Sequence, residues 1–359
     1  MKKLLITRRF IFFFIITNLS LVFAYDTSSS HVAQGKKNQH TPIIALEPAG
    51  PKVSNGADVF VSLDYLFWNV NAGSQLSAVE INSSSPAPTL PRQRSFSLFD
   101  HWTSGFKVAL GLNISYDDWF TLTEYTWLRP SQSQKATAYA SYSFKAPIWT
   151  FLSNNNASQP GGVFEEDSHL NFNVIDWKIG RNAYFGKHLT LAPHLGLKGT
   201  WQTFQNNQSL QNTQAINFNP LTFTGPIRQF YKNTHHGIGI LTGIKLNLFL
   251  TPALYIESQL ECTGMWSKNA IDIQIAADDD PTPLKWKFAD YKRTHYPIDF
   301  IADFLLGLGY LKYFSHDNYC LSISTGWVCQ TWIDWIPTTI LSNANLNLQG
   351  LDLKVRFDF

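Results

Sequence analysis

The chain has 359 residues and a formal charge of +2, with 44% hydrophobic and 15% aromatic residues. This balance lacks the basic surplus that nucleic-acid binding needs. After residue 24 no stretch comes near 18 consecutive apolar residues, so helical membrane spans are excluded. The three cysteines, Cys262, Cys320 and Cys329, form neither a disulfide framework nor a paired metal-ligand motif, and we expect them to be single small residues on strands.

The first 24 residues are typical of a secretory signal peptide. A basic opening precedes an apolar run at residues 10–16, and Ala24 ends a small-residue cleavage site. That run is far shorter than the roughly 20 residues of a spanning helix. Residues 25–56 are polar and rich in Ser, Lys, Gln and Pro, which predicts a flexible periplasmic leader. The predicted organisation is therefore signal peptide 1–24, leader 25–56 and a barrel domain 57–359.

Ten segments after residue 57 alternate apolar and polar residues with a period of two. They cover residues 59–68, 102–116, 119–128, 172–185, 188–202, 236–250, 254–266, 299–314, 319–332 and 347–359. Successive side chains of a strand point to opposite faces, so many of these strands have one apolar face and one polar face. Most of them exceed the usual strand length of roughly 5–6 residues, whereas a tilted strand crosses a bilayer in about 9–11.

The connections between these segments alternate between short and long, as in transmembrane barrels with short periplasmic turns and long outer loops. A soluble β-sandwich also alternates along its strands, but it has no reason for every second connection to be long. Because lipid offers no partner to a backbone N–H, a spanning sheet must close on itself. Aromatic residues near strand ends fit the interfacial belts of a membrane protein. These are Trp102, Tyr116, Trp119, Trp127, Tyr255, Trp266 and Tyr319.

The sequence therefore predicts an all-β fold, a closed antiparallel transmembrane β-barrel of ten strands in an outer membrane. Further strands within residues 135–144 and 284–288 would raise the number to twelve. The last segment, GLDLKVRFDF, alternates five apolar residues with four charged ones. We expect its apolar face to meet lipid and its charged face to meet the lumen.

Five motifs stand in an order that resembles the Legionella-type major outer membrane protein family, which also occurs in environmental relatives of chlamydiae. The motifs are VFVSLDYLFWNVNAG, HWTSGFKVALGLNISYDDWFTLTEYTWL, NFNVIDWKIGRNAYF, LTLAPHLGLKGTWQ and GLDLKVRFDF. The resemblance implies an abundant Gram-negative outer-membrane β-barrel, treated as a porin and sometimes as an adhesin. It implies no catalytic residue. By the same resemblance, the terminal Phe357 and Phe359 look like the signal that barrel-assembly machinery reads.

Charged residues of both signs occupy the predicted inward positions, and we expect them to line a pore. The pore-lining candidates are Lys107, Glu124, Asp176, Lys178, Lys198, Lys245, Glu257, Glu261, Asp303, Asp352, Lys354 and Arg356. The structural alternative is that opposite charges pair across strands and fill a narrow barrel. Ten strands lie near the filled end of the range. Inward glycines, such as Gly111 and Gly309, relieve crowding or let aromatic side chains lie across the bore.

Three classes of function remain after this reading. The first is a porin that passes small polar solutes or ions through a lumen of mixed charge. The second is a surface adhesin or structural envelope barrel without an open pore, presenting polar outer loops at residues 154–168 and 204–220. The third is an enzyme or metal protein built on His235, His236, His295 and the acidic run at residues 278–280. A nucleophile–base pair at defined spacing is missing, so we expect no enzyme, no metal and no cofactor.

The expected partners follow from that setting. They are outer-membrane lipid, the barrel-assembly machinery through the C-terminal strand, and a host surface through the outer loops. Assembly into a homo-oligomer is left open, and nucleic acid is not expected as a partner.

Overall fold

The computed structural model describes residues 53, 59–71, 76–82, 94–97, 100–114, 117–137, 142–145, 162–211, 216–218, 221–223, 226–278, 285–339 and 342–359. The predicted signal peptide lies outside these residues, as does the predicted leader except for Val53. Within the described part of the chain, no helix has the length and apolar character needed to cross a membrane.

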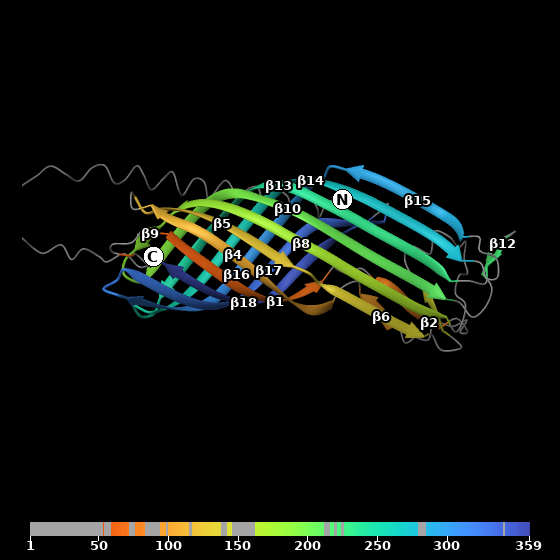
Figure 1. The fold of residues 1–359 in the computed structure, drawn as a ribbon, viewed down its shortest axis with the longest axis horizontal. Coiled ribbons are helices and arrows are strands. Elements are labelled where there is room, and N and C mark those ends of the chain that lie inside the picture. Colours follow the sequence, from red (N-terminus) through yellow and green to blue (C-terminus); the bar gives the residue numbers. More distant parts are fainter. Residues whose placement is uncertain are drawn as a thin grey trace, which may run out of the picture. The chain divides into compact units, whose positions relative to one another are not determined.

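Ten antiparallel strands form the barrel. They are β1 (Val59–Asn71), β4 (Asp100–Ile114), β5 (Trp119–Leu128), β8 (Val163–Arg181), β10 (Leu189–Gln211), β13 (Ile227–Phe249), β14 (Leu254–Asp278), β16 (Ile298–Phe314), β17 (Tyr319–Thr339) and β18 (Ser342–Asp358). In this order each strand pairs with the next, including β8 with β10. Each predicted segment coincides with one of these strands, so the predicted fold is confirmed (Figure 1).

The barrel closes between the first and last of these strands. β1 pairs with β18 from Phe60↔Asp358 to Asn71↔Asn347. At the edge of this pairing, the Phe359 N–H donates to the Val59 carbonyl at 2.9 Å, and the Val59 N–H donates back at 3.2 Å. Closure leaves no free edge in the barrel wall, as lipid requires.

The remaining strands lie outside this ring, so the barrel has the ten strands predicted and they do not raise the number to twelve. β6 (Ser131–Thr137) pairs only with β8, and β15 (Lys285–His295) pairs only with β14. β9 (Ala183–Phe185) pairs with β10. Two small sheets complete the described strands, one of β3 (Arg94–Ser97), β2 (Leu76–Asn82) and β7 (Tyr142–Lys145), the other of β11 (Ile216–Phe218) and β12 (Leu221–Phe223).

Four strands run well beyond their predicted ends. β8, β10, β13 and β14 are 19 to 25 residues long and pair with one another throughout. In Figure 1 they project together at the end opposite the C-terminus, with β6 and β15 at their sides. The predicted outer loops at 154–168 and 204–220 are thus strand at 163–168, 204–211 and 216–218. The prediction failed there because a strand that projects into water needs no apolar outer face.

Tight turns join the strands at the opposite end. Asp117 and Asp118 (φ 61° and 55°) connect β4 to β5, and Ser315, His316 and Asp317 (φ 54–66°) connect β16 to β17. Residues of this polar kind tolerate the left-handed region better than branched ones do. By the barrel convention of short inner turns, this end faces the periplasm and the projecting strands face outward.

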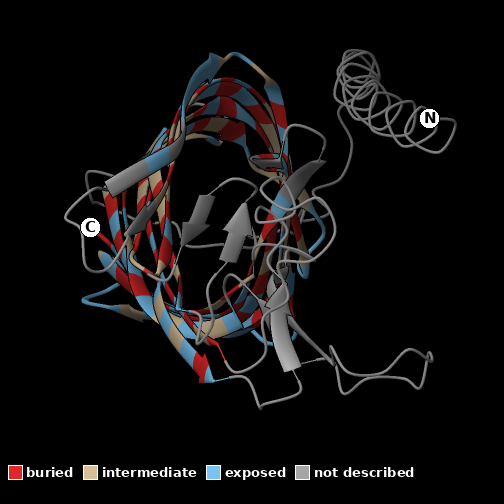
Figure 2. Ribbon diagram, turned by 90° about the vertical axis from the view of Figure 1, so that its right-hand side faces the viewer, coloured by how far each residue is buried: buried red, intermediate tan, exposed pale blue. Residues whose placement is uncertain are grey.

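Burial alternates along much of the barrel strands, which gives the banding of Figure 2. On β18, Leu351, Leu353, Val355 and Phe357 are 40–41% exposed, whereas Asp352 is 4% exposed. Leu63, Leu110 and Leu306 are likewise half-exposed on other strands. The outward face is therefore the apolar one and the inward face the polar one, as lipid outside and a polar lumen inside require.

Candidate functional site: the barrel lumen

The twelve candidate residues lie on inward faces and line one or both of two cavities. The first cavity, of about 60 Å³, is bordered by Lys107, Glu124, Asp176, Lys178, Lys198, Glu257, Glu261, Asp303, Asp352 and Lys354. The second, of about 120 Å³, adds Lys245 and Arg356. Five residues line both cavities, so the cavities adjoin through Glu124, Lys178, Gln259, Glu261 and Lys354.

Lys178 forms the shortest ion pair across the lumen among the described residues. Its Nζ lies 2.7 Å from Glu261 Oε1 and 3.8 Å from Glu124 Oε1. Glu261 also bonds His194 Nε2 at 2.9 Å. Because β10 and β13 stand between β8 and β14 in the wall, the Lys178–Glu261 pair spans the bore instead of joining neighbouring strands.

A second lysine joins two aspartates a few residues further out. Lys198 Nζ lies 2.8 Å from Asp176 Oδ2 and 3.4 Å from Asp303 Oδ2. Asp176 is on the adjacent strand β8, but Asp303 is on β16 and is reached across the lumen. The Lys198 side chain is almost fully buried, and it borders the first cavity together with both aspartates.

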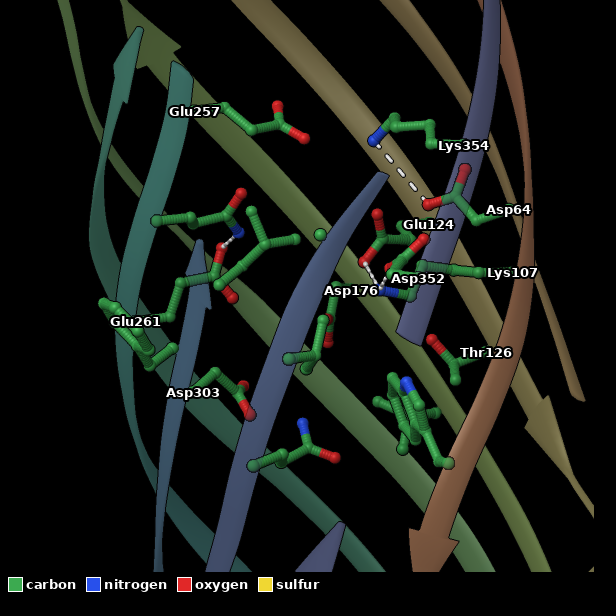
Figure 3. Close-up of a pocket in the computed structure, with 18 of the residues that line it drawn as sticks. Asp64, Lys107, Glu124, Thr126, Asp176, Glu257, Glu261, Asp303, Asp352 and Lys354 are labelled. Atoms are coloured by element: carbon green, nitrogen blue, oxygen red, sulfur yellow. Dashed lines mark hydrogen bonds and ion pairs between the residues drawn. The ribbon is translucent and has the colours of Figure 1, made fainter. Parts of the chain in front are cut away.

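The opposite wall carries a matching group of charges (Figure 3). Lys107 Nζ lies 3.4 Å from Asp352 and 3.8 Å from Glu124. Lys354 Nζ lies 3.7 Å from Asp64 Oδ2. The structural alternative considered from the sequence is thus observed: charges of opposite sign pair across strands and occupy much of the bore.

The two cavities differ in charge. The described lining of the first holds seven carboxylates against four lysines, a formal charge of −3. The lining of the second holds four cations against two carboxylates, a formal charge of +2 with His194 counted neutral. Four buried aspartate oxygens of the first cavity have no hydrogen-bond partner within the described chain. These are the Oδ1 atoms of Asp64, Asp176, Asp303 and Asp352.

An apolar layer fills the lumen on the outer side of the charges. Its largest members are Trp68, Phe172, Phe204, Trp332 and Trp335. Phe172 and Trp332 meet edge to face at 5.6 Å between ring centroids. Trp68 and Phe172 also line the first cavity, so the layer forms its outer boundary.

The apolar layer is fixed by a polar network around His235. Trp335 Nε1–H donates to His235 Nδ1 at 3.2 Å, and His235 Nε2–H donates to Asp299 Oδ2 at 3.0 Å. The Ser267 hydroxyl donates to the same aspartate oxygen. An indole can only donate, so His235 carries its proton on Nε2. A register shift after Trp332, with Asp334 at φ 60°, precedes Trp335 on β17.

This placement bears on the metal hypothesis. His235 is buried inside the barrel, whereas its neighbour His236 is exposed on the outer face. Two side chains on opposite faces of one strand cannot bind the same ion. No group of three His, Cys, Asp or Glu suited to a metal occurs in the described residues, and Asp279 and Asp280 lie outside them.

Inward glycines receive aromatic side chains. A Cβ on Gly111 would lie 2.1 Å from Phe60 Cζ, and one on Gly309 would lie 2.2 Å from Tyr255 Cζ. Phe60 is in turn covered by the Arg356 guanidinium at 3.6 Å from the ring centroid. Each ring therefore packs over a glycine of a neighbouring strand, and Phe60 borders the second cavity.

Several lining residues were not among the candidates. His194, Gln259 and Trp68 border the cavities. They were not predicted, because the candidates were limited to Asp, Glu, Lys and Arg residues at inward positions. Trp68 shares the inward parity of Asp64 on β1, so the period of two was the available signal. Cys262, Cys320 and Cys329 are free thiols on β14 and β17.

Solved structures with a similar fold are outer-membrane barrels. The outer membrane protease OmpT from Escherichia coli is 11% identical, with a TM-score of 0.44 over 85% of this chain and 97% of that one. A FadL homologue from Pseudomonas aeruginosa is 8% identical (TM-score 0.23, 88% and 95% covered). The Pseudomonas putida toluene transporter TodX is 10% identical (TM-score 0.23, 85% and 92% covered). A comparison with curated proteins gave no match.

One sequence-based expectation needs correction in view of these structures. The prediction that the chain is not an enzyme is contradicted by this comparison, because one of the matched barrels, OmpT, is a protease. At 11% identity the likeness concerns the fold alone, and it assigns no protease activity to this chain.

The family comparison covers nearly all of the barrel. The model of the Legionella pneumophila major outer membrane protein precursor matches residues 51–359, a span that holds all ten barrel strands. The resemblance drawn from the motifs is thereby confirmed, and the barrel fold agrees with an outer-membrane location. The chain belongs to the Legionella major outer membrane protein family.

Proposed function

We propose that the barrel is a narrow channel for ions and small polar solutes. The observation that carries the proposal is the pair of adjoining polar cavities, which share five lining residues at the level of the Lys178–Glu261 bridge. Charged pore walls of this kind control which solutes pass. The ion pairs and the apolar layer make the bore narrow, so the expected solutes are no larger than small ions and their hydration water.

The charge of the first cavity supports a preference for cations. Its lining carries a surplus of three carboxylates, and four buried aspartate oxygens there have no donor among the described residues. A cation entering this cavity would satisfy oxygens that otherwise cost desolvation energy.

Planar bilayer recordings test both statements. We expect stepwise conductance, and a reversal potential in a salt gradient that favours the cation. Glu124 borders both cavities, so Glu124→Gln should reduce the cation preference. Bilayers that stay electrically silent although folded barrels are demonstrably inserted would overturn the proposal.

A second candidate, an adhesin or structural barrel without an open pore, rests on one observation. The apolar layer around Trp68, Phe172 and Trp332 fills the outer lumen, and long hairpins project beyond the apolar belt. Vesicles carrying the protein would then bind a host surface and conduct nothing. Replacing the connection at residues 279–284 by a Gly-Ser linker should abolish that binding, whereas a channel would keep its conductance.

A further inference from the structure

The outward face of β13, β14 and β15 changes from apolar to basic side chains just beyond the lipid-facing belt. Ile238, Trp266 and Ile298 are cross-strand neighbours on this face and are 58–62% exposed. One step outward, His236 pairs with Lys268 in the strand register, and the exposed Tyr296 follows β15. Four residues further along the strands, Lys232, Asp272 and Lys292 are cross-strand neighbours. Lysines thus follow immediately after the apolar surface.

Most of these cations are not neutralised. Lys292 contacts Asp272 at 3.4 Å and remains 67% exposed. Lys232 and Lys268 make no ion pair within the described residues. The four residues Lys232, Lys268, Lys292 and Asp272 carry a net formal charge of +2.

The outer parts of β6 and β8 carry a different surface. Lys135 on β6 is held by Glu165 at 2.6 Å, and Asp167 and Asp100 add negative charge nearby. Arg129 is satisfied by two backbone carbonyls and Asn173. Unneutralised lysines just beyond the belt are therefore a feature of β13, β14 and β15 among the described strands.

The aromatic residues of the outer face also differ between β14 and the other strands. Trp102 stacks on Phe67, Trp127 on Phe106, and Trp201 on Tyr125. Trp266, in contrast, makes no ring contact in the described chain and is 62% exposed. Tyr296 beside it is 75% exposed, the highest value among the large apolar and aromatic side chains. Two exposed aromatic side chains thus adjoin the lysines: Trp266 lies one step below Lys268 and Tyr296 lies level with it.

We propose that Lys232, Lys268 and Lys292 bind the phosphates of a multiply phosphorylated lipid in the outer leaflet, with Trp266 and Tyr296 against its apolar part. Lysines beside a membrane surface attract anionic headgroups, and aromatic side chains favour the interface. Four residues separate Lys268 from the Lys232–Lys292 level, about 13 Å along the strand. With a strand tilt of about 40° this is about 10 Å in height, which favours a headgroup with two separated acidic groups.

The test uses the full-length barrel in neutral phosphatidylcholine nanodiscs, with bound lipid counted by native mass spectrometry. The probe is a bisphosphorylated glycolipid, compared with its monophosphorylated form and with inorganic phosphate. We expect tightest binding of the bisphosphorylated form, and roughly 100-fold weaker binding for the triple variant Lys232→Gln, Lys268→Gln, Lys292→Gln. The matched control Lys135→Gln should bind as the parent protein does.

A second variant separates a lipid from a free anion. Trp266→Ala should weaken binding of the glycolipid and leave inorganic phosphate unaffected. Undiminished glycolipid binding by the folded triple variant would overturn the proposal, as would equal binding of the bisphosphorylated lipid and inorganic phosphate. If the triple variant fails to fold, Lys268→Gln alone must still weaken binding for the proposal to stand.

Discussion

Lys178 Nζ and Glu261 Oε1 meet at 2.7 Å across the lumen, from strands that are not neighbours in the wall. Both side chains are about 95% or more buried. Such a pair holds opposite sides of the barrel together only while both charges are present. Removing one partner leaves the other charge buried without compensation, which typically costs about 3–5 kcal/mol.

The first prediction follows from this pair. Lys178→Met should lower the free energy of unfolding by about 3 kcal/mol, because Glu261 and Glu124 lose a shared cation. Urea unfolding in lipid vesicles measures the change. The double variant Lys178→Met, Glu261→Gln should recover part of the loss, and a double variant less stable than Lys178→Met would contradict the pairing.

A second prediction concerns the glycine beneath Tyr255. A Cβ at residue 309 would lie 2.2 Å from the Tyr255 ring, so Gly309→Ala must displace that ring and should destabilise the barrel by about 1–3 kcal/mol. Gly264→Ala is the matched control, because its Cβ would meet nothing closer than Phe300 Cε1 at 3.9 Å. The same unfolding experiment compares them, and equal stabilities of the two variants would disprove the ring-over-glycine contact.

The third prediction addresses the apolar layer. Trp332 is fully buried against Phe172 and His235, so Trp332→Ala removes a large part of the layer. If the layer limits passage, unitary conductance should rise about twofold or more. Trp327→Ala, on the same strand but on the lipid-facing side, should leave conductance unchanged. Identical currents from Trp332→Ala and the parent barrel would show that the barrier lies elsewhere.

The period of two carried most of what the sequence could predict. It located all ten strands and their inward faces, because lipid outside forces an apolar face along each crossing. It failed beyond the lipid: Phe164, Leu170, Tyr231 and Ile271 are buried on strands whose outer faces are polar. There buried residues alternate with solvated ones in largely polar sequence, such as FQNNQSLQ at residues 204–211, and such sequence is typical of a loop.

The lumen was predicted as a set of residues and not as an arrangement. Parity placed Lys178 and Glu261 on inward faces, but it says nothing about which charges meet across the bore. That depends on the stagger of ten strands, which the individual strand patterns do not encode. The inward Trp335 was missed for a related reason, since the register shift on β17 precedes it and breaks the parity.

The assembly role of the C-terminal strand stays a prediction, and its position in the barrel shapes the test. Phe357 stacks on Tyr319 at 5.8 Å and on Phe359 at 5.9 Å, all on the outer face. Phe359→Ala keeps the backbone bonds to Val59, so the refolded variant should lose no more than about 1 kcal/mol of stability. Its level in the outer membrane should nevertheless fall well below that of the parent, measured by fractionation against Tyr319→Ala, which loses a similar ring contact. Equal levels of the two variants would show that the terminal ring acts through packing and not through recognition.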